Sequence, residues 1–167
     1  MTINFEVRGA ELGDVPALAR VHVDTWRETY RGLMRDDTLD DPSLLNWRKK
    51  FWEAALTDPK YAQNTVAVAS HEGTVVGIAM SGPADEVADS ARQLFLLYVY
   101  AAFHGSGIGA ALLNAVIGPA TPAALWVADP NPRAQAFYRK NGFSNDGQVR
   151  IDDGVRSVRM RRHFHTS

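Results

Sequence analysis

Three glycines at every second position stand in the segment FHGSGIGAALL, residues 103–113 of this 167-residue chain. An apolar helical pattern follows them at once, which is typical of a turn that opens a helix. The first N–H groups of a helix have no partner within it, and the helix dipole adds partial positive charge there. Because Gly105, Gly107 and Gly109 have no Cβ, an anion can come close to these N–H groups. The segment therefore predicts a site for a phosphate-bearing ligand.

Short runs of apolar and β-branched residues predict the strands that position this turn. We expect strands at residues 3–9, 65–70, 74–82, 92–100, 123–128, 143–149 and 155–162. The second and third of these form a hairpin that turns at Glu72–Gly73. The run RQLFLLYVY is nearly continuously apolar, so we expect its strand to be buried on both faces.

Four helices are expected between these strands. The first begins near Asp14 and ends at Gly32, and its apolar face is formed by Leu18, His22, Trp26 and Tyr30. The second lies within residues 41–56, and its inner side is formed by Leu44, Trp47, Phe51 and Ala55. The third runs from the glycine turn to about residue 117, and the fourth runs from an Asn131 cap to Asn141.

The resulting order, β-α-α-β-β-β-α-β-α-β-β, indicates an α/β (α+β) fold. Its centre is a mixed sheet of about seven strands flanked by about four helices. We expect one domain over residues 1–167, because no linker or repeat interrupts the chain.

Composition excludes several classes of protein. A net charge of -1 argues against nucleic acid or an anionic membrane as a partner. The chain has no cysteine, so disulfides, thiolate metal sites and a cysteine nucleophile are excluded. No apolar run reaches the ~18 residues of a membrane span, and acidic residues occupy the start where a signal peptide is apolar. We therefore expect a cytoplasmic protein.

A dinucleotide-binding fold is one alternative interpretation of the glycine turn. GSGIGA fits the G-x-G-x-x-A pattern, and Asp129 follows the next strand. Against it, residues 100–104 separate the strand from the first glycine, and too few parallel strands are predicted for a doubly wound sheet.

LLYVYAAFHGSGIGAALL followed by ALWVADPNPRAQAFYRKNGF resembles the GNAT superfamily of acyl-CoA-dependent N-acyltransferases. The specific likeness covers about residues 93–143, and the predicted order of elements extends it to the whole chain. The resemblance implies that acetyl-CoA is the co-substrate and that no metal is needed. It implies a small-molecule or peptide amine as acceptor, and it is compatible with a homodimer.

The resemblance also implies roles for single residues. The main chain of Leu97, Tyr98 and Val99 is expected to pair with the pantetheine arm, with the Val99 N–H directed at the thioester oxygen. Asn131 is expected to bond the pantetheine arm through its side chain. The loop that holds the pyrophosphate is expected to comprise His104, Gly105, Ser106, Gly107, Ile108, Gly109 and Ala110.

Tyr138 matches the position whose hydroxyl meets the departing sulfur. A phenol of pKa ~10 and a thiol of pKa ~8.5 make full proton transfer cost ~2 kcal/mol in water. We therefore expect Tyr138 to donate a hydrogen bond to the thiolate.

The general base stays open. Gln93 stands where many family members carry a glutamate, and His104 and Gly105 stand where the loop is often basic. An alkylamine of pKa ~10.4 is neutral in only about one molecule in 2500 at pH 7, so its proton must be removed. The candidates are His22, Asp24, Glu28 and a chain of water molecules.

Aromatic, acidic and basic residues lie in three different places around the acceptor end, the region that is expected to bind the acceptor amine. The resemblance puts it between the first two helices and the last strands, where Trp26, Tyr30, Trp47, Phe51 and Trp52 occur. The segment RDDTLDD is expected to be a solvated acidic loop near the rim, with attraction of a cationic amine as the alternative. Four arginines on the last strand suggest the protection of a sheet edge: Arg156, Arg159, Arg161 and Arg162. His163 and His165 lack the further ligands that a metal site needs.

These observations predict direct transfer of an acetyl group from acetyl-CoA to a primary amine in a ternary complex. A non-catalytic acyl-CoA-binding module is the first alternative, because a glutamine replaces the usual glutamate at Gln93. A nucleotide-dependent oxidoreductase is the second. The identity of the acceptor, the acyl length and the oligomeric state stay undetermined by the sequence.

Overall fold

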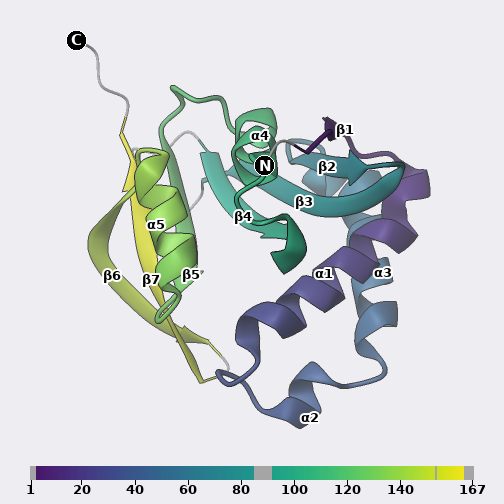
Figure 1. Ribbon diagram of the computed structural model, residues 1–167, viewed down its shortest axis with the longest axis horizontal. Coiled ribbons are helices and arrows are strands. Elements are labelled where there is room, and N and C mark those ends of the chain that lie inside the picture. Colours follow the sequence, from purple (N-terminus) through teal and green to yellow (C-terminus); the bar gives the residue numbers. More distant parts are fainter. Residues whose placement is uncertain (1–2, 85–91, 153, 164–167) are drawn as a thin grey trace.

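The computed structural model describes residues 3–84, 92–152 and 154–163, which form a strongly twisted sheet with helices on both faces (Figure 1). The strands are β1 (Glu6–Gly9), β2 (Thr65–His71), β3 (Thr74–Pro83), β4 (Arg92–Val99), β5 (Ala123–Ala128), β6 (Ser144–Asp152) and β7 (Val155–Arg162). The α-helices are α1 (Val15–Tyr30), α2 (Asp36–Leu39), α3 (Leu44–Thr57), α4 (Ile108–Val116) and α5 (Pro132–Lys140). The strand order in the sheet is β1-β2-β3-β4-β5-β7-β6. The predicted fold class and order of elements are confirmed, with the short α2 as an addition.

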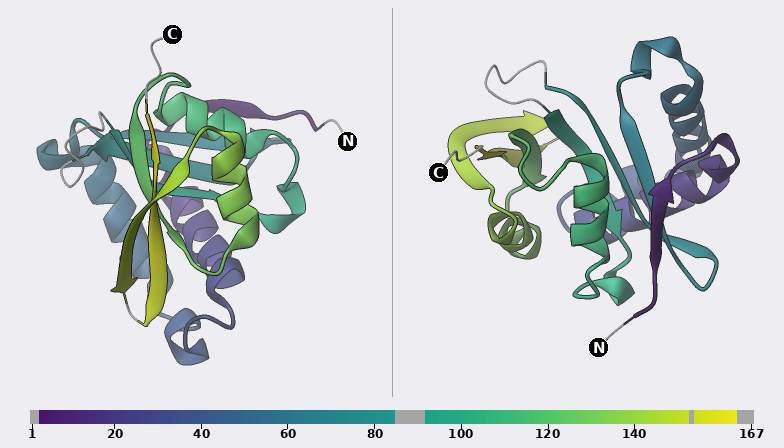
Figure 2. Two further views of the ribbon diagram at one scale, coloured as in Figure 1. Left: turned by 90° about the vertical axis from the view of Figure 1, so that its left-hand side faces the viewer. Right: turned by 90° about the horizontal axis from the view of Figure 1, so that it is seen from above.

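Successive side chains along a strand point to opposite faces of the sheet, and this alternation separates two hydrophobic cores. Val66 and Val68 of β2 face a core with α1 and α3, whereas Ala67 and Ala69 face a core with α4 and α5. The view from above in Figure 2 shows α1 and α3 on one side of β3 and α4 on the other. Each face of the sheet is thus covered by two helices that come from different parts of the chain.

Local chemistry explains the predicted hairpin. Its turn places Glu72 at φ 51° and Gly73 at φ 81°, both in the left-handed region. Hairpin turns of this kind match the twist of the flanking strands. The expected turn at these two residues is therefore confirmed. At the start of the chain the expected strand over residues 3–9 is shorter, since β1 begins at Glu6.

A glycine lets α4 approach the sheet closely. A Cβ built at Gly77 of β3 would lie 2.9 Å from Leu112 Cδ1 and 3.2 Å from Ile108 Cγ2. Both of these side chains are fully buried on α4. The tight packing fixes the start of α4, and with it the glycine turn, against β3 and β4.

The strands β4 and β5 diverge. They pair in parallel over three residue pairs, the last of which is Leu94↔Leu125. Beyond it the two halves of the sheet turn away from each other, and Figure 2 shows the strands of one half crossing those of the other at a steep angle. The expectation that residues 92–100 are buried on both faces is wrong: Phe95 is 43% exposed. Because β5 leaves β4, no strand or helix covers this stretch completely.

The dinucleotide-binding alternative is also wrong. Among the strand pairs that the structure describes, β4–β5 is the one parallel pair, and the remaining neighbours are antiparallel. A doubly wound nucleotide-binding sheet consists mostly of parallel strands.

The inner side of α3 differs from the prediction. Leu44 is buried as expected, but Trp47 is 56% exposed and Phe51 is partly exposed. Trp52 is fully buried in their place and packs in the core beneath α1. The buried side of α3 is thus rotated by one residue from the predicted one. The aromatic residues at 51 and 52 are equally apolar, so the sequence pattern cannot show which of them is buried.

Candidate active site

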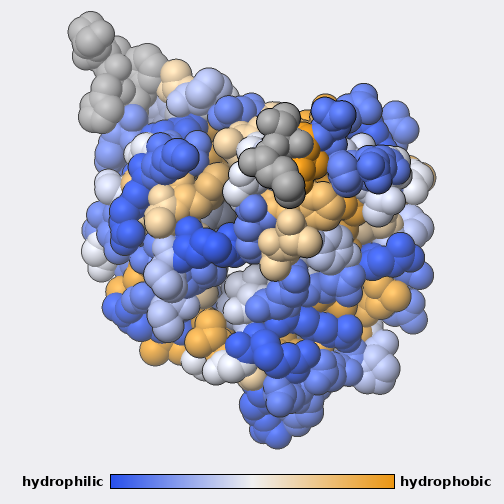
Figure 3. Space-filling model, viewed as in Figure 1, coloured by the Kyte–Doolittle hydropathy of each residue, from blue (hydrophilic) through white to orange (hydrophobic). Residues whose placement is uncertain are grey.

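A cavity of about 700 Å³ opens where β4 and β5 part. Its walls include Leu94–Val99 of β4 and Leu125–Ala128 of β5. In the view of Figure 3 the surface is hollowed between α5 on one side and α1 and α4 on the other. The unpaired edge of β4 therefore faces a space large enough for an extended ligand.

The peptide groups of Val99 point toward that space. The N–H of Tyr100 donates to Val76 O on β3 at 3.1 Å, and successive peptide groups of a strand alternate in direction. The N–H and C=O of Val99 therefore point away from β3. His104 Nε2 lies 2.9 Å from Val99 O, so its ring N–H donates to this carbonyl. Burial lowers the pKa of His104, which favours the neutral ring. Leu97, two residues earlier, presents its peptide groups to the same edge.

Two glycines give the turn its conformation. Gly105 has φ +80° and Gly107 has φ +92°, a region that residues with a Cβ rarely adopt. Gly107 is the N-cap residue of α4, so the left-handed backbone aims the first N–H groups of the helix outward. The turn follows β4 after a single 3-10 turn at Ala101–Phe103.

Ser106 and Ile108 stabilise the turn from within. The Ser106 hydroxyl donates to Phe103 O at 2.6 Å and accepts from Ile108 N at 3.3 Å, while Ser106 N donates to Phe103 O at 3.3 Å. Ile108 is fully buried in the core. The structure thus does not place these two predicted site residues on the cavity wall, because their polar groups and side chains are already used inside the protein.

The other residues of the predicted loop behave differently. The cavity is lined by His104, Gly105, Gly107, Gly109 and Ala110. Within the described part of the chain, the N–H groups of the last four of these have no hydrogen-bond partner. The N–H groups of residues 104–110 therefore divide into two sets. Those of His104, Ser106 and Ile108 are bonded internally, and the other four are free to bind a ligand at the positive end of α4.

Asn131 closes the opposite wall. It caps α5, its Oδ1 accepts from Ala134 N at 3.3 Å, and the residue lines the cavity. The side-chain NH₂ is a second hydrogen-bonding group that the cap does not use. Arg133 and Lys140 of the same helix also line the cavity, whereas Arg139 donates to Gln135 Oε1.

Tyr138 stands on α5 between two aromatic rings. It is 8% exposed, and its ring makes edge contacts with Phe137 and Phe143. Burial raises the pKa of the Tyr138 hydroxyl above its usual range, so this group is a stable hydrogen-bond donor at neutral pH. Tyr138 shares the cavity wall with Leu97, Tyr98 and Val99.

A second, smaller cavity of about 250 Å³ adjoins the first. The two cavities share Tyr30, Leu94, Phe95, Tyr98, Trp126 and Ala128 as lining residues. The smaller one extends toward Arg150 and Asp152 of β6, whose side chains form an ion pair at 2.8 Å. It extends the shared space away from the glycine turn, whose residues line the larger cavity alone.

Tyr30 and Tyr98 form a pair of phenols where the cavities meet. Both residues line both cavities, and burial raises the pKa of each hydroxyl group. The sequence analysis placed Tyr30 on an aromatic helix face and among the aromatic residues at the acceptor end, and it used Tyr98 only for its main chain. The pair joins α1 to β4 across a long stretch of sequence, so no local pattern indicates it.

The candidate bases differ in their surroundings. His22 is buried, its Nδ1 accepts from Trp52 Nε1 at 3.1 Å, and burial lowers its pKa to about 3. It is therefore too weak a base for an amine. The Asp24 carboxylate accepts from the Tyr100 hydroxyl at 2.6 Å. Glu28 lines the larger cavity at the end near the glycine turn and accepts from Ala101 N at 3.3 Å.

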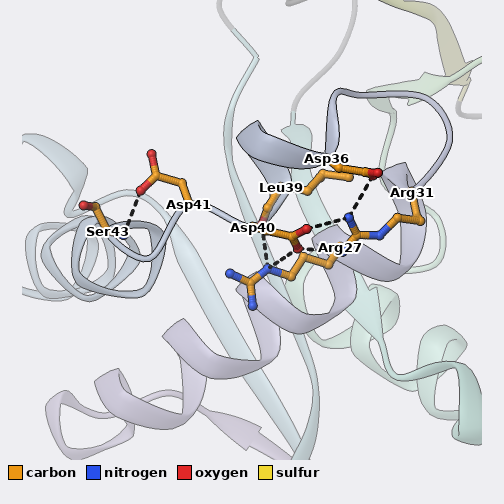
Figure 4. A network of polar contacts seen from close by, with 7 residues as sticks. All are labelled: Arg27, Arg31, Asp36, Leu39, Asp40, Asp41 and Ser43. Atoms are coloured by element: carbon orange, nitrogen blue, oxygen red, sulfur yellow. Dashed lines mark hydrogen bonds and ion pairs between the residues drawn. The ribbon is translucent and has the colours of Figure 1, made fainter.

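The acidic segment is neutralised by arginines (Figure 4). Arg31 donates to Asp36 at 3.0 Å and to Asp40 at 2.7 Å, and Arg27 donates to Leu39 O. Arg35 pairs with Asp37 in the same way. Residues expected in a solvated acidic loop instead form the short α2 and hold it to the end of α1. Asp41 accepts from Ser43 N at the start of α3.

The arginines of β7 do not protect a sheet edge, because β7 lies between β5 and β6. Arg156 pairs with Asp129 and Arg159 pairs with Asp146. Arg162 donates to the carbonyl groups of Gly118, Thr121 and Asn141. These side chains therefore connect β7 to β6 and to neighbouring loops.

Two kinds of feature are absent from the described residues. Within them, no helix is long and apolar enough to cross a membrane. No cluster of three or more histidine, aspartate or glutamate side chains in that part of the chain could hold a metal ion. His165 lies outside the described residues.

Comparison with known proteins places these features in a family context. Residues 37–164 match the family model described as the acetyltransferase (GNAT) domain. A probable N-acetyltransferase of Mycobacterium tuberculosis is 31% identical over 157 residues, which cover 87% of this chain and 83% of that protein.

Solved structures agree on the fold. The PaiA N-acetyltransferase of Thermoplasma acidophilum, crystallised with coenzyme A, has a TM-score of 0.73 and 20% identity over 97% of this chain and 100% of that one. A Corynebacterium glutamicum protein described as histone acetyltransferase HPA2 and related acetyltransferase has a TM-score of 0.74 and 21% identity, with 99% of each chain covered.

Proposed function

The chain belongs to the GNAT family of acetyltransferases, and from this we propose that it moves the acetyl group of acetyl-CoA directly to a primary amine. Both substrates are held together in a ternary complex, and residues 1–167 act as one domain. The observation that carries the proposal is the set of four free N–H groups at the start of α4, which opens onto the cavity between β4 and β5.

The glycine turn holds the diphosphate of the coenzyme. Gly105, Gly107, Gly109 and Ala110 direct free N–H groups into the larger cavity, and the dipole of α4 adds positive charge. Arg133 on the facing helix supplies a full positive charge at the same cavity. The coenzyme A bound to the Thermoplasma protein supports this assignment, because the two folds correspond over nearly the whole chain.

The edge of β4 receives the pantetheine arm. Peptide groups of Leu97 and Val99 face the cavity and pair with the amides of the arm as an added strand does. The Asn131 side chain bonds the arm from the other wall. The Val99 N–H donates to the thioester oxygen and stabilises the negative charge that develops there when the amine attacks.

Tyr138 serves the leaving group. When the tetrahedral intermediate breaks down, the C–S bond breaks and its electron pair stays on the sulfur of coenzyme A. The Tyr138 hydroxyl donates a hydrogen bond to this thiolate. Because burial raises the pKa of Tyr138, its proton stays on the phenol, and the thiolate takes its proton from solvent afterwards.

The acceptor amine enters through the smaller cavity. This route reaches the reaction space from the side opposite the diphosphate, so both substrates fit at once. Asp24 is occupied by Tyr100 and His22 is too weak a base. We therefore assign removal of the ammonium proton to water in the cavity, with Glu28 as the one candidate base that lines it.

Calorimetry and a thiol-release assay test the proposal. The full chain should bind coenzyme A and acetyl-CoA, and it should release free thiol from acetyl-CoA when a suitable amine is added. Absence of coenzyme binding by correctly folded protein would contradict the transferase function. Binding without thiol release, across a broad amine panel, would instead favour the non-catalytic acyl-CoA-binding module.

A further inference from the structure

Arg150 of β6 is an arginine whose guanidinium is held in place in the smaller cavity. Arg150 lines this cavity together with Trp126 of β5 and Asp152 of β6. The Arg150 Cζ atom lies 4.3 Å from the centroid of the Trp126 ring, so the guanidinium lies over the indole. Its Nε atom is 2.8 Å from Asp152 Oδ2. Contacts with an aromatic ring and with a carboxylate therefore restrict the movement of this group.

The terminal nitrogens of Arg150 are the part of the group that the protein leaves unused. A guanidinium carries five N–H donors, and Asp152 takes the one on Nε. Within residues 3–84, 92–152 and 154–163, no hydrogen bond or ion pair joins Nη1 or Nη2 to another residue. The Arg150 side chain is 44% exposed, so a ligand in the smaller cavity can reach these donors. The edge that they form matches the two oxygens of a planar anion.

Asp152 is held less firmly than Arg150. Its side chain is 64% exposed, and the ion pair with Arg150 is the one polar contact of that side chain among the described residues. A group that is fixed before a ligand arrives loses less conformational entropy on binding. Asp152 therefore suits the role of a positioning residue, and Arg150 suits the role of the group that binds the ligand.

The rest of the smaller cavity is uncharged. Apart from the pair formed by Arg150 and Asp152, no charged side chain in the described part of the chain lines it. The other polar lining residues are Tyr30, Gln93, Tyr98 and Ser157. A ligand there therefore meets one fixed cation and several neutral hydrogen-bonding groups.

The surroundings of Arg150 are continuous with the reaction space. Trp126, over which the guanidinium lies, lines the larger cavity as well as the smaller one. Tyr30 and Tyr98 do the same. A molecule bound beside Arg150 can therefore extend into the cavity that is proposed to hold the thioester.

We propose that the acceptor is an amine that also carries a carboxylate, and that the Nη1 and Nη2 groups of Arg150 bind this carboxylate. The inference rests on the proposed function, which has the acceptor in the smaller cavity, and it names the substrate class. The Arg150 charge repels the ammonium end of the acceptor, so the amine is directed toward the thioester and away from β6. Asp152 already balances part of the Arg150 charge, so a carboxylate suits the site better than a dianion such as a phosphate monoester.

Thiol release from acetyl-CoA tests the inference with matched amines. The panel contains α-amino acids, ω-amino acids of increasing chain length, the carboxamide of each, and diamines of the same lengths. The wild-type chain should use the best carboxylate at least about tenfold more efficiently, in kcat/KM, than its carboxamide, as expected for charge-assisted hydrogen bonds. In Arg150→Gln this preference should vanish through a higher KM for the carboxylate. Arg150→Lys keeps the charge but not the planar edge and should retain part of the preference.

Arg156→Gln is the matched control. Arg156 of β7 is also about half exposed and pairs with an aspartate, Asp129, but neither of these residues lines a cavity. This variant should keep the full preference for the carboxylate. Asp152→Asn should weaken the preference without abolishing it, because the guanidinium loses one of its two contacts and keeps the Trp126 ring.

A dead-end complex gives a readout that needs no turnover. With coenzyme A bound in place of acetyl-CoA, calorimetry should show that the preferred carboxylate binds at least about tenfold more tightly than its carboxamide. Arg150→Gln should lose this difference. It should still bind coenzyme A with the wild-type affinity, because Arg150 does not line the larger cavity, and this affinity also shows that the variant is folded.

Several results would overturn the inference and leave the proposed function intact. They are equal use of carboxylate and carboxamide, a preference that survives in Arg150→Gln or is lost in Arg156→Gln, and faster transfer to diamines than to amino acids. Absence of transfer to every amine, or loss of acetyl-CoA binding, would contradict the proposed function itself and the inference with it.

Discussion

The Tyr138 hydroxyl on α5 has a proposed role that a single substitution can test. Tyr138 is buried between Phe137 and Phe143, so replacing it with phenylalanine keeps the packing and removes one oxygen. In the proposed mechanism its hydroxyl donates to the departing sulfur and does not contact the diphosphate. Its contribution should therefore appear in turnover and not in affinity.

Tyr138→Phe should lower kcat by about 10- to 1000-fold, the range for loss of one positioned donor or acid. The dissociation constant of acetyl-CoA, measured by calorimetry, should stay within about twofold of the wild-type value. The hydroxyl acts on the departing sulfur and not on the bound ground state of the substrate. A variant that turns over at the wild-type rate would remove the role of this hydroxyl.

His22 links pH to stability. Its folded-state pKa is about 3, below the value of about 6.5 for an exposed histidine, so the unfolded chain binds a proton that the folded chain does not. The stabilisation is present above about pH 6.5 and is lost as the pH falls toward about 3. Urea unfolding at several pH values measures this slope.

His22→Asn serves as the comparison, because the amide oxygen can accept from Trp52 Nε1 as His22 Nδ1 does. The variant should lose less stability than the wild type between pH 6.5 and 4. An identical pH dependence in the two proteins would mean that His22 does not titrate as its burial requires.

At the scale of elements, the first turn of α4 is the part of the fold that is proposed to bind the diphosphate of the coenzyme. The free N–H of Ala110 lies in the first turn, where proline is tolerated because no hydrogen bond within the helix is lost. Ala110→Pro should weaken coenzyme A binding by about 10- to 100-fold, since hydrogen bonds to charged groups contribute about 1.5–3 kcal/mol. Calorimetry gives the affinity, and far-UV circular dichroism checks the fold. Unchanged affinity would exclude this N–H from the diphosphate site.

The contact between α4 and β3 sets the position of that turn. Gly77→Ala places a methyl group against Leu112 and Ile108 and should destabilise the protein by about 1–3 kcal/mol. Gly9→Ala is a suitable control, because a Cβ there would meet no described atom within 4 Å. Urea denaturation measures the free energy of unfolding of both variants. Equal values would show that α4 can move away from β3 without loss of stability.

The elements that could be predicted from the sequence are those specified by residues close together in the chain. The hairpin at Glu72–Gly73 and the glycine turn follow from backbone preferences of single residues. What the sequence could not indicate depends on contacts between distant segments. Whether residue 51 or 52 is buried on α3, and which N–H groups of the turn Ser106 consumes, are decided by packing. The stacking of Arg48 on α3 over the Trp26 ring on α1 joins two separate elements and has no signature in either of them.

At the scale of the whole molecule, ligand binding should be visible as stability. Acetyl-CoA at 100 times its dissociation constant should add about 2.7 kcal/mol to the free energy of unfolding, which raises the melting temperature by about 5–10 °C for a chain of this size. Differential scanning fluorimetry measures the shift, and NADH should produce none. Stabilisation by NADH in place of acetyl-CoA would contradict the family assignment of the site.

The short pairing between β4 and β5 has one more consequence. Three residue pairs join the two halves of the sheet there, and the rest of that edge of β4 offers its amides to water. Amides without a protein acceptor exchange their hydrogens readily, and a bound pantetheine arm would protect them. In the proposed complex the substrate therefore completes the main-chain network across the centre of the protein, and the sheet reaches its full connectivity only while that substrate is in place.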